Sequence, residues 1–241
     1  MLPILIIKAG TTFPEIKIQF GDFDDWILHY SGLTGKDVSV VEVFDNDRLP
    51  NNGSFSGVIL TGSHSMVTDQ DDWINKTTEW VSYIFEKQIP FLGICFGHQI
   101  LARAAGGISG FHPKGREIGT VELSVHPESK YDHLFRDLPA SFLAHVTHLQ
   151  TVLRLPENAD VLASNDFEPH HAFRVGTCAW GVQFHPEFSS DIMRAYIDEQ
   201  RDTLVKEGFN VGVLNSQVSE TAESHFLLRR FVDFVFERNG G

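Results

Sequence analysis

Cys95 stands between two glycines in the run Gly93–Gly97, at the point where an apolar strand pattern changes to a helical one. A sharp strand-to-helix turn of this kind is typical of a nucleophile elbow, here with a thiol as the attacking group. The glycines allow the backbone to turn sharply and the helix to approach the strand closely. The helix N-terminus favours a thiolate, and the Phe96 N–H would point toward an oxyanion. The pattern therefore predicts a nucleophilic Cys95, against the alternative of a buried structural cysteine.

A cysteine nucleophile needs a neighbouring base that a third group orients. His185 follows an apolar run that ends at Phe184, and Glu187 comes two residues later, beyond the rigid Pro186. This spacing can place the carboxylate beside the second imidazole nitrogen. The tripeptide alone is a weak signal, because His126 opens an identical His-Pro-Glu. Only the later copy follows an apolar strand, so His185 and Glu187 are the predicted pair, and His126 is expected in a loop.

Two patterns of secondary structure surround these residues. In the first half, apolar runs alternate with helical patterns, which predicts an α/β fold with a mostly parallel sheet and helices on both faces. The strands expected there are 2–7, 38–44, 57–61 and 91–94, with helices through 20–30, 73–88 and 99–105. Closely spaced strands at 118–125, 142–146, 161–164, 171–175 and 178–184 predict added antiparallel hairpins. Apolar residues between 227 and 235 predict a closing helix, and one domain is expected over 1–241.

Composition narrows the classes of function. Lys and Arg total 19 against 32 Asp and Glu, a net charge of −13, which should repel nucleic acid and anionic membranes. No stretch approaches the roughly 20 apolar residues that cross a bilayer, and the N-terminal run lacks the basic flank of a signal peptide. With only two cysteines, a reducing, cytoplasmic location is expected, and Cys178 is expected to be a bystander. No Cys/His spacing matches a zinc site, so no metal is expected.

Two blocks, Gly93–Gln99 and Trp180–Phe188, resemble the signature blocks of the class I glutamine amidotransferases in content, order and separation. A third, Gly57–Ser63, is similar to the oxyanion strand and loop of that family. The likeness covers about residues 40 to 190 and is closest to stand-alone members, both those of the GMP-synthase type and the γ-glutamyl peptide hydrolases. The loop Thr61–His64 departs from the two glycines and proline that many members carry.

The resemblance implies roles for particular residues. Cys95 would be the nucleophile, His185 the acid and base, and Glu187 its orienting partner. The backbone at Gly62 and the N–H of Phe96 would form the oxyanion hole. The residues that would hold the substrate are Ser63, Gln99, His148, Leu149 and Gln150. Many members have an acid where the last of these stands, which leaves the far end of the substrate open.

The chemistry that this family implies is a two-step acyl transfer from glutamine or another γ-glutamyl amide, through a thioester and without a cofactor. Three functions remain open. The chain would be a glutaminase-type amidotransferase that passes ammonia to a separate synthetase subunit, or a free-standing hydrolase of γ-glutamyl peptides. The third alternative is a non-catalytic regulatory or interaction module on the same fold. The intact Cys–His–Glu set counts against the third.

Overall fold

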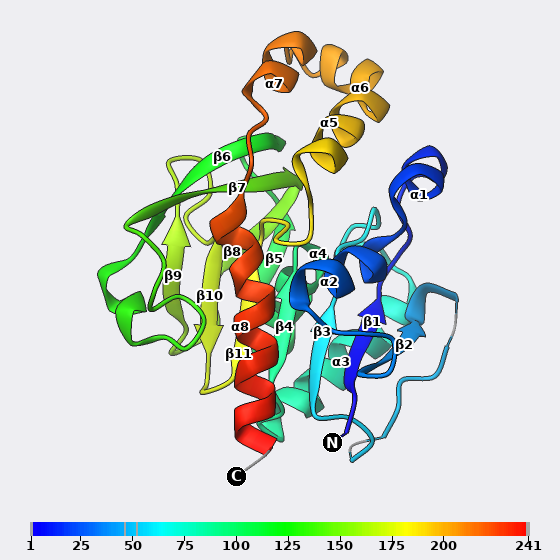
Figure 1. The fold of residues 1–241 in the computed structure, drawn as a ribbon, viewed down its shortest axis with the longest axis vertical. Coiled ribbons are helices and arrows are strands. Elements are labelled where there is room, and N and C mark those ends of the chain that lie inside the picture. Colours follow the sequence, from blue (N-terminus) through cyan, green and yellow to red (C-terminus); the bar gives the residue numbers. More distant parts are fainter. Residues whose placement is uncertain (1, 46, 52, 240–241) are drawn as a thin grey trace.

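The computed structural model describes residues 2–45, 47–51 and 53–239, so Met1 and the last two glycines of the expected 1–241 domain lie outside the described residues. Its centre is a nine-stranded sheet (Figure 1). The strands of this sheet are β1 (Ile4–Lys8), β2 (Val38–Glu42), β3 (Gly57–Leu60), β4 (Phe91–Ile94), β6 (Glu117–Val125), β7 (Ser141–His148), β9 (Asp160–Ser164), β10 (Ala172–Val175) and β11 (Ala179–Val182). Two further strands, β5 (Ile108–Phe111) and β8 (Gln150–Arg154), pair with each other.

The sheet has a parallel half and an antiparallel half, in the strand order β2-β1-β3-β4-β11-β10-β9-β6-β7. Every pairing from β2 to β11 is parallel, and every pairing from β11 to β7 is antiparallel. Strands β1, β3, β4 and β11 are buried along their whole length, as expected for strands covered on both faces. The predicted α/β sheet with added hairpins is confirmed.

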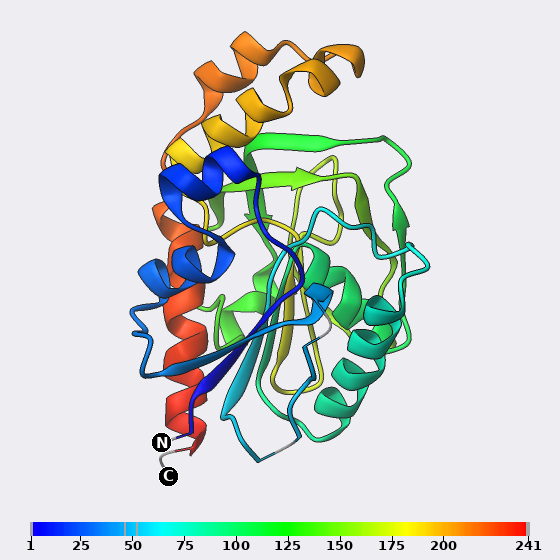
Figure 2. The same ribbon diagram turned by 90° about the vertical axis from the view of Figure 1, so that its right-hand side faces the viewer.

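Helices cover both faces of the parallel half. The helices are α1 (Pro14–Phe20), α2 (Phe23–Ser31), α3 (Asp72–Glu86), α4 (Phe96–Ala104), α5 (Ser190–Glu199), α6 (Arg201–Lys206), α7 (Val211–Gln217) and α8 (Ala222–Asn239), with 3-10 turns at Val43–Asp45 and Pro127–Tyr131. Ile4 and Ile6 of β1 face the core under α2 and α8, whereas Leu5 and Ile7 face the core under α3 and α4. These two groups of helices lie on opposite sides of the sheet (Figure 2). None of the helices in the described ranges is long and apolar enough to cross a membrane.

Several elements differ from the expectation. The helix expected through 20–30 is two helices, because Gly21 ends α1 with a φ of 83° and Asp22 begins α2 with a capping box. The second strand ends at Glu42 and not at residue 44, and a 3-10 turn follows it. No element was expected in 190–217, yet this segment forms α5, α6 and α7, which stand beyond the carboxyl ends of the parallel strands (Figure 1). Of these three helices, α5 contributes Tyr196 to the lining of the site described below.

Candidate active site

Cys95 is the single residue between β4 and α4, at the carboxyl end of the strand. Its φ of 51° and ψ of −99° are a strained conformation for a residue with a side chain. The Cys95 N–H donates to the Val182 carbonyl at 2.8 Å, which ties the turn to β11. A Cβ on Gly93 would overlap the Gly97 carbonyl, and a Cβ on Gly97 would overlap the Leu60 carbonyl. The sharp turn expected around Cys95 is therefore present, and close backbone approach demands both glycines.

His185 and Glu187 come directly after β11 and lie beside this turn. Nδ1 of His185 is 2.7 Å from Oε1 of Glu187, and since a carboxylate accepts, Nδ1 carries the proton. Phe188 stacks on the imidazole with 4.1 Å between ring centroids. The His185 N–H donates to the His145 carbonyl at 2.8 Å. The imidazole is thus held by a carboxylate and an aromatic ring, and the main chain of His185 is anchored by a hydrogen bond.

The charges around His185 favour the imidazolium. Burial by itself lowers the pKa of His185, but the negative charges of Glu187 and Cys95, together with the hydrogen bond to Glu187, raise it to about 10. Its second nitrogen, Nε2, is buried without a conventional hydrogen-bond partner among the described residues. Nε2 is therefore the atom free to exchange a proton with the thiol or with a substrate. Such an arrangement can support nucleophilic catalysis by a thiolate.

Gly62, in the loop after β3, lies against the same group of residues. A Cβ at Gly62 would be 3.0 Å from Cε1 of His185 and 3.7 Å from Cβ of Cys95. The Ser63 hydroxyl donates to the Ala9 carbonyl at 2.7 Å, which holds this loop in place. The structure thus brings together the two predicted oxyanion groups, the loop at Gly62 and the N-terminus of α4 at Phe96.

A cavity of about 200 Å³ opens over Cys95. Every residue predicted to hold the substrate borders it: Ser63, Gln99, His148, Leu149 and Gln150. Other residues of the wall were not predicted from the sequence, among them Phe13, Phe23, Arg116, Tyr196 and Gln200. They come from distant segments that share no spacing or motif. His64, which also borders the cavity, belongs to the loop Thr61–His64 that the sequence had already singled out.

The protein-family model for glutamine amidotransferase class-I matches residues 18–201. The chain belongs to this family. It is 29% identical over 188 residues to gamma-glutamyl peptidase 3 of Arabidopsis thaliana, a match that covers 76% of each chain. Gamma-glutamyl peptidase 4 of the same plant is 32% identical over 201 residues, covering 80% of this chain and 79% of the relative.

Two further comparisons concern amidotransferases. The glutamine-hydrolyzing GMP synthase of Porphyromonas gingivalis is 36% identical over 150 residues, which is 61% of this chain but 28% of that relative. A solved glutamine amidotransferase from Thermotoga maritima superposes with a TM-score of 0.79 at 23% identity, covering 98% of this chain and 99% of that one. The predicted family and fold are both confirmed.

The polar wall of the amidotransferase cavity is largely bound to other protein groups. The Gln99 side-chain amide donates to the Gln150 carbonyl at 2.8 Å and to Oε1 of Gln183 at 3.0 Å. His148 places Nδ1 3.0 Å from the Gln150 carbonyl and Nε2 2.9 Å from Oε2 of Glu117. Both ring nitrogens of His148 thus lie within hydrogen-bonding distance of an acceptor. The direct substrate contacts predicted for Gln99 and His148 remain predictions, since the donors of both side chains already have partners.

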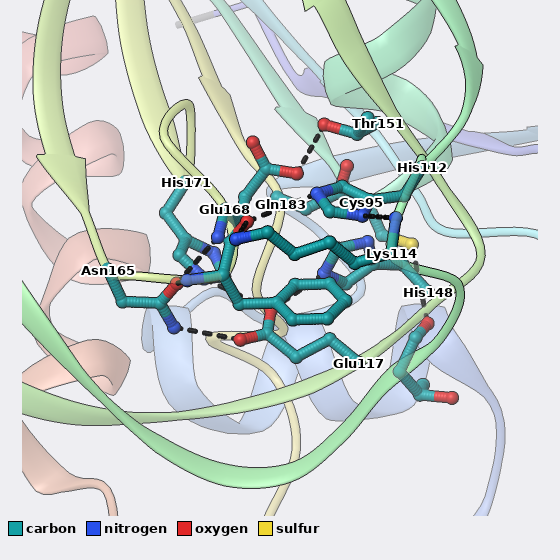
Figure 3. A network of polar contacts seen from close by, with 12 residues as sticks. Cys95, His112, Lys114, Glu117, His148, Thr151, Asn165, Glu168, His171 and Gln183 are labelled. Carbon is teal, nitrogen blue, oxygen red and sulfur yellow. Dashed lines mark hydrogen bonds and ion pairs between the residues drawn. The ribbon is translucent and has the colours of Figure 1, made fainter.

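A buried polar network lies behind this wall of the amidotransferase (Figure 3). Glu117 accepts hydrogen bonds from His148 and, at 2.8 Å, from the Asn165 amide. Its Oε2 also lies 3.2 Å from Nε2 of His171. Burial alone would raise the pKa of Glu117, but the hydrogen bonds from the two histidines hold it well below its usual range. Within the described ranges, no group of three or more His, Cys, Asp or Glu is placed to hold a metal ion. The hydrogen bond from His148 to Glu117 ties the end of β7 to this network.

The second cysteine of the amidotransferase and its second His-Pro-Glu lie away from the site. Cys178 precedes β11, at the opposite end of the strands from Cys95, and its Sγ is 3.2 Å from the Gln88 carbonyl. Burial raises the pKa of Cys178, which disfavours a reactive thiolate. His126 follows β6 and pairs with the Ser164 hydroxyl at 2.9 Å. Neither residue borders the cavity over Cys95.

Proposed function

We propose that this class I glutamine amidotransferase hydrolyses a γ-glutamyl amide, with Cys95, His185 and Glu187 as its catalytic triad. One observation carries the proposal. The 2.7 Å hydrogen bond from His185 to Glu187 leaves Nε2 of the same ring free beside the strained turn at Cys95. A nucleophile, a base and an orienting acid in this order are what covalent acyl transfer requires. The substrate would bind in the cavity that opens over Cys95.

The first step forms a thioester. The Cys95 sulfur adds to the δ-carbonyl carbon, and the carbonyl electron pair moves to the oxygen, where the Phe96 N–H and the backbone at Gly62 stabilise the negative charge. The oxyanion then collapses, the carbon–nitrogen bond breaks, and protonated His185 gives its Nε2 proton to the leaving nitrogen. Ammonia leaves from glutamine, and an amine leaves from a γ-glutamyl peptide.

The second step returns the thiol. Neutral His185 takes a proton from water, the resulting hydroxide adds to the thioester carbonyl, and the carbon–sulfur bond breaks. Glutamate leaves, and the Cys95 thiolate and the imidazolium are restored. Glu187 keeps its position throughout, where its charge stabilises the imidazolium. Neither step needs a cofactor.

Two versions of this function differ in the fate of the nitrogen that leaves. As a glutaminase-type amidotransferase, the chain would deliver ammonia to a separate synthetase subunit, and the similarity to GMP synthase supports this version. As a free-standing hydrolase it would cleave γ-glutamyl peptides and release the amine. The gamma-glutamyl peptidases of Arabidopsis support the second version, because they match the chain over more of its length.

The deciding experiment measures steady-state glutamate release by the purified chain from glutamine and from a set of γ-glutamyl dipeptides. Cys95→Ser serves as the inactive control. Turnover of dipeptides without any partner supports the free-standing hydrolase. Turnover of glutamine alone supports the glutaminase-type enzyme. No turnover of any substrate, with Cys95 shown to be reduced and open to alkylation, would contradict a self-sufficient hydrolase and leave a synthetase-activated amidotransferase or a non-catalytic module.

A further inference from the structure

One side of the cavity over Cys95 is aromatic. Phe13, from the segment before α1, lies against His64 with 4.2 Å between ring centroids, and its ring is 5.4 Å from that of Tyr196 on α5. The rings of His64 and Tyr196 are 5.9 Å apart. All three border the cavity, and α1 lies beside α5 there (Figure 2). Three segments far apart in the sequence thus build one aromatic wall.

This wall lies on the side of His185. Phe188 stacks on His185 and also packs against Tyr196, with 4.7 Å between the centroids of the second pair. His64 is close enough for the charge of His185 to affect it. His185 is the group that would protonate the leaving nitrogen, so the leaving group must extend toward it. The glutamyl part of the substrate is then left to the polar lining of the cavity, which includes Gln99 and Gln150.

The polar atoms of the aromatic wall make it suited to a ring rather than to a charge. Partial desolvation, with a smaller contribution from the charge of His185, lowers the pKa of His64 to about 4, so its ring is neutral at pH 7. The Tyr196 hydroxyl is 2.7 Å from the Thr12 hydroxyl and 3.4 Å from Nε2 of His64. The wall therefore offers ring faces and edges, with the phenol already paired.

The aromatic side chains differ in how open they are. Phe23 and Tyr196 are buried and help to hold α2 and α5 in the core. Phe13 is half-buried, and His64, although its neighbours partly desolvate it, keeps surface open to solvent, so their rings are available to a ligand that enters the cavity. Aromatic surface of this kind binds another ring by offset stacking or edge-to-face contact.

We propose that Phe13, His64 and Tyr196 form a subsite for the leaving group, which selects γ-glutamyl amides whose amine carries an aromatic ring. The inference rests on the proposed function, because proton transfer by His185 is what assigns the leaving group to this side. It adds a substrate class, amides of aromatic amines or of aromatic amino acids, to the γ-glutamyl specificity.

The test compares kcat/KM for γ-glutamyl-phenylalanine and γ-glutamyl-alanine. A ring in this subsite should give the wild-type protein a preference of roughly tenfold for the aromatic substrate. Phe13→Ala should reduce the preference to about twofold or less, by lowering kcat/KM for the aromatic substrate more than for the alanine one. The matched control is Ile18→Ala, on α1 but 81% exposed and outside the cavity, which should keep the preference. Phe13→Leu, which retains apolar volume without a ring, replaces Phe13→Ala if thermal unfolding shows that the latter is misfolded.

A binding experiment separates this subsite from the proposed chemistry. In Cys95→Ala, calorimetry measures the two dipeptides without turnover, and the aromatic one should bind roughly tenfold more tightly. Tighter aromatic binding with no turnover in the wild type would keep the subsite and contradict the proposed hydrolysis. Turnover of both dipeptides with equal kcat/KM would keep the hydrolysis and overturn the subsite. Equal or undetectable binding of the two dipeptides, with no turnover, would also overturn the subsite.

Discussion

Nδ1 of His185 and Oε1 of Glu187 lie 2.7 Å apart, although only Pro186 separates the two residues in the chain. A carboxylate two residues away is close enough to form this contact locally, and the proline limits the conformations that would break it. Cys95, in contrast, comes from a strand 90 residues earlier and meets this pair because β4 and β11 are parallel neighbours. The acid–base pair is therefore local, and its partnership with the thiol is tertiary.

The first prediction concerns the two members of that pair. Glu187→Gln should lower kcat by about 10²-fold or more, because the neutral amide no longer stabilises the imidazolium, while His185→Ala should cost more, because the proton carrier is gone. Steady-state kinetics on a γ-glutamyl substrate measures both. A silent Glu187→Gln would mean that the carboxylate is structural and that the catalytic set is a dyad.

The other His-Pro-Glu of the chain provides the matched control. His126→Ala removes the contact with the Ser164 hydroxyl, outside the cavity over Cys95, and should leave kcat/KM within about twofold. Glu128→Ala should behave in the same way, since Glu128 lies in a 3-10 turn after β6 and does not border the cavity. Large losses in these variants, together with small losses at His185, would show that the acid–base pair belongs to the earlier His-Pro-Glu and not to the later one.

The second prediction concerns the charge on His185. Its pKa is raised to about 10 in the folded protein, against roughly 6.5 for an unfolded histidine. A raised pKa means that the protonated ring stabilises the fold fully below about pH 6.5 and that this contribution is lost as the pH rises to about 10. Glu187→Gln removes the main charge that raises the pKa, so the variant should lose less stability over this range. Denaturant unfolding of both proteins between pH 6 and 10 checks this, and parallel pH profiles would contradict it.

The third prediction compares the two cysteines with the same substitution. Cys95→Ser should reduce turnover by several orders of magnitude and leave the unfolding temperature close to that of the wild type, because a serine hydroxyl is a far poorer nucleophile than a thiolate. Cys178→Ser should keep turnover, since its hydroxyl can still donate to the Gln88 carbonyl away from the site. Activity of Cys95→Ser within about tenfold of wild type would rule out Cys95 as the nucleophile.

The fourth prediction separates a glycine of the site from a glycine of the fold. Gly97→Ala should destabilise the protein by about 1–3 kcal/mol, because a new Cβ overlaps the Leu60 carbonyl. Gly62→Ala should have a smaller effect on stability but lower kcat, because its Cβ would press on Cε1 of His185. Chemical denaturation and kinetics on the two variants test this. Equal losses of stability would mean that Gly62 is a packing glycine without a special place at the site.

The motif around Cys95 shows how much of the site could be predicted from local sequence. A strand, two glycines and a helix start dictate a sharp turn, so the place of Cys95 at the sheet edge followed from Gly93 and Gly97. The same holds for Glu187 beside His185, where two residues of separation suffice. The break between α1 and α2 was equally local, with Gly21 and Asp22 as its signals, and it was missed because the apolar periodicity on both sides is continuous.

The aromatic wall and α5–α7 show what local sequence could not predict. Phe13, His64 and Tyr196 belong to three segments whose contact depends on how α1 and α5 pack at the carboxyl end of the sheet. Hydrophobic periodicity reports which face of an element is buried, but it does not report which distant element covers that face.

The sequence by itself determined the family, the α/β class and the turn at Cys95, because strand and helix periodicity, glycine sterics and short spacings act over a few residues. Only the tertiary structure decided that Gly62 lies beside His185, that both nitrogens of His148 are near acceptors of Glu117 and Gln150, and that an aromatic wall borders the cavity over Cys95. Those contacts join residues that are far apart in the chain, and side-chain packing across the sheet edge, which no local pattern encodes, sets their distances.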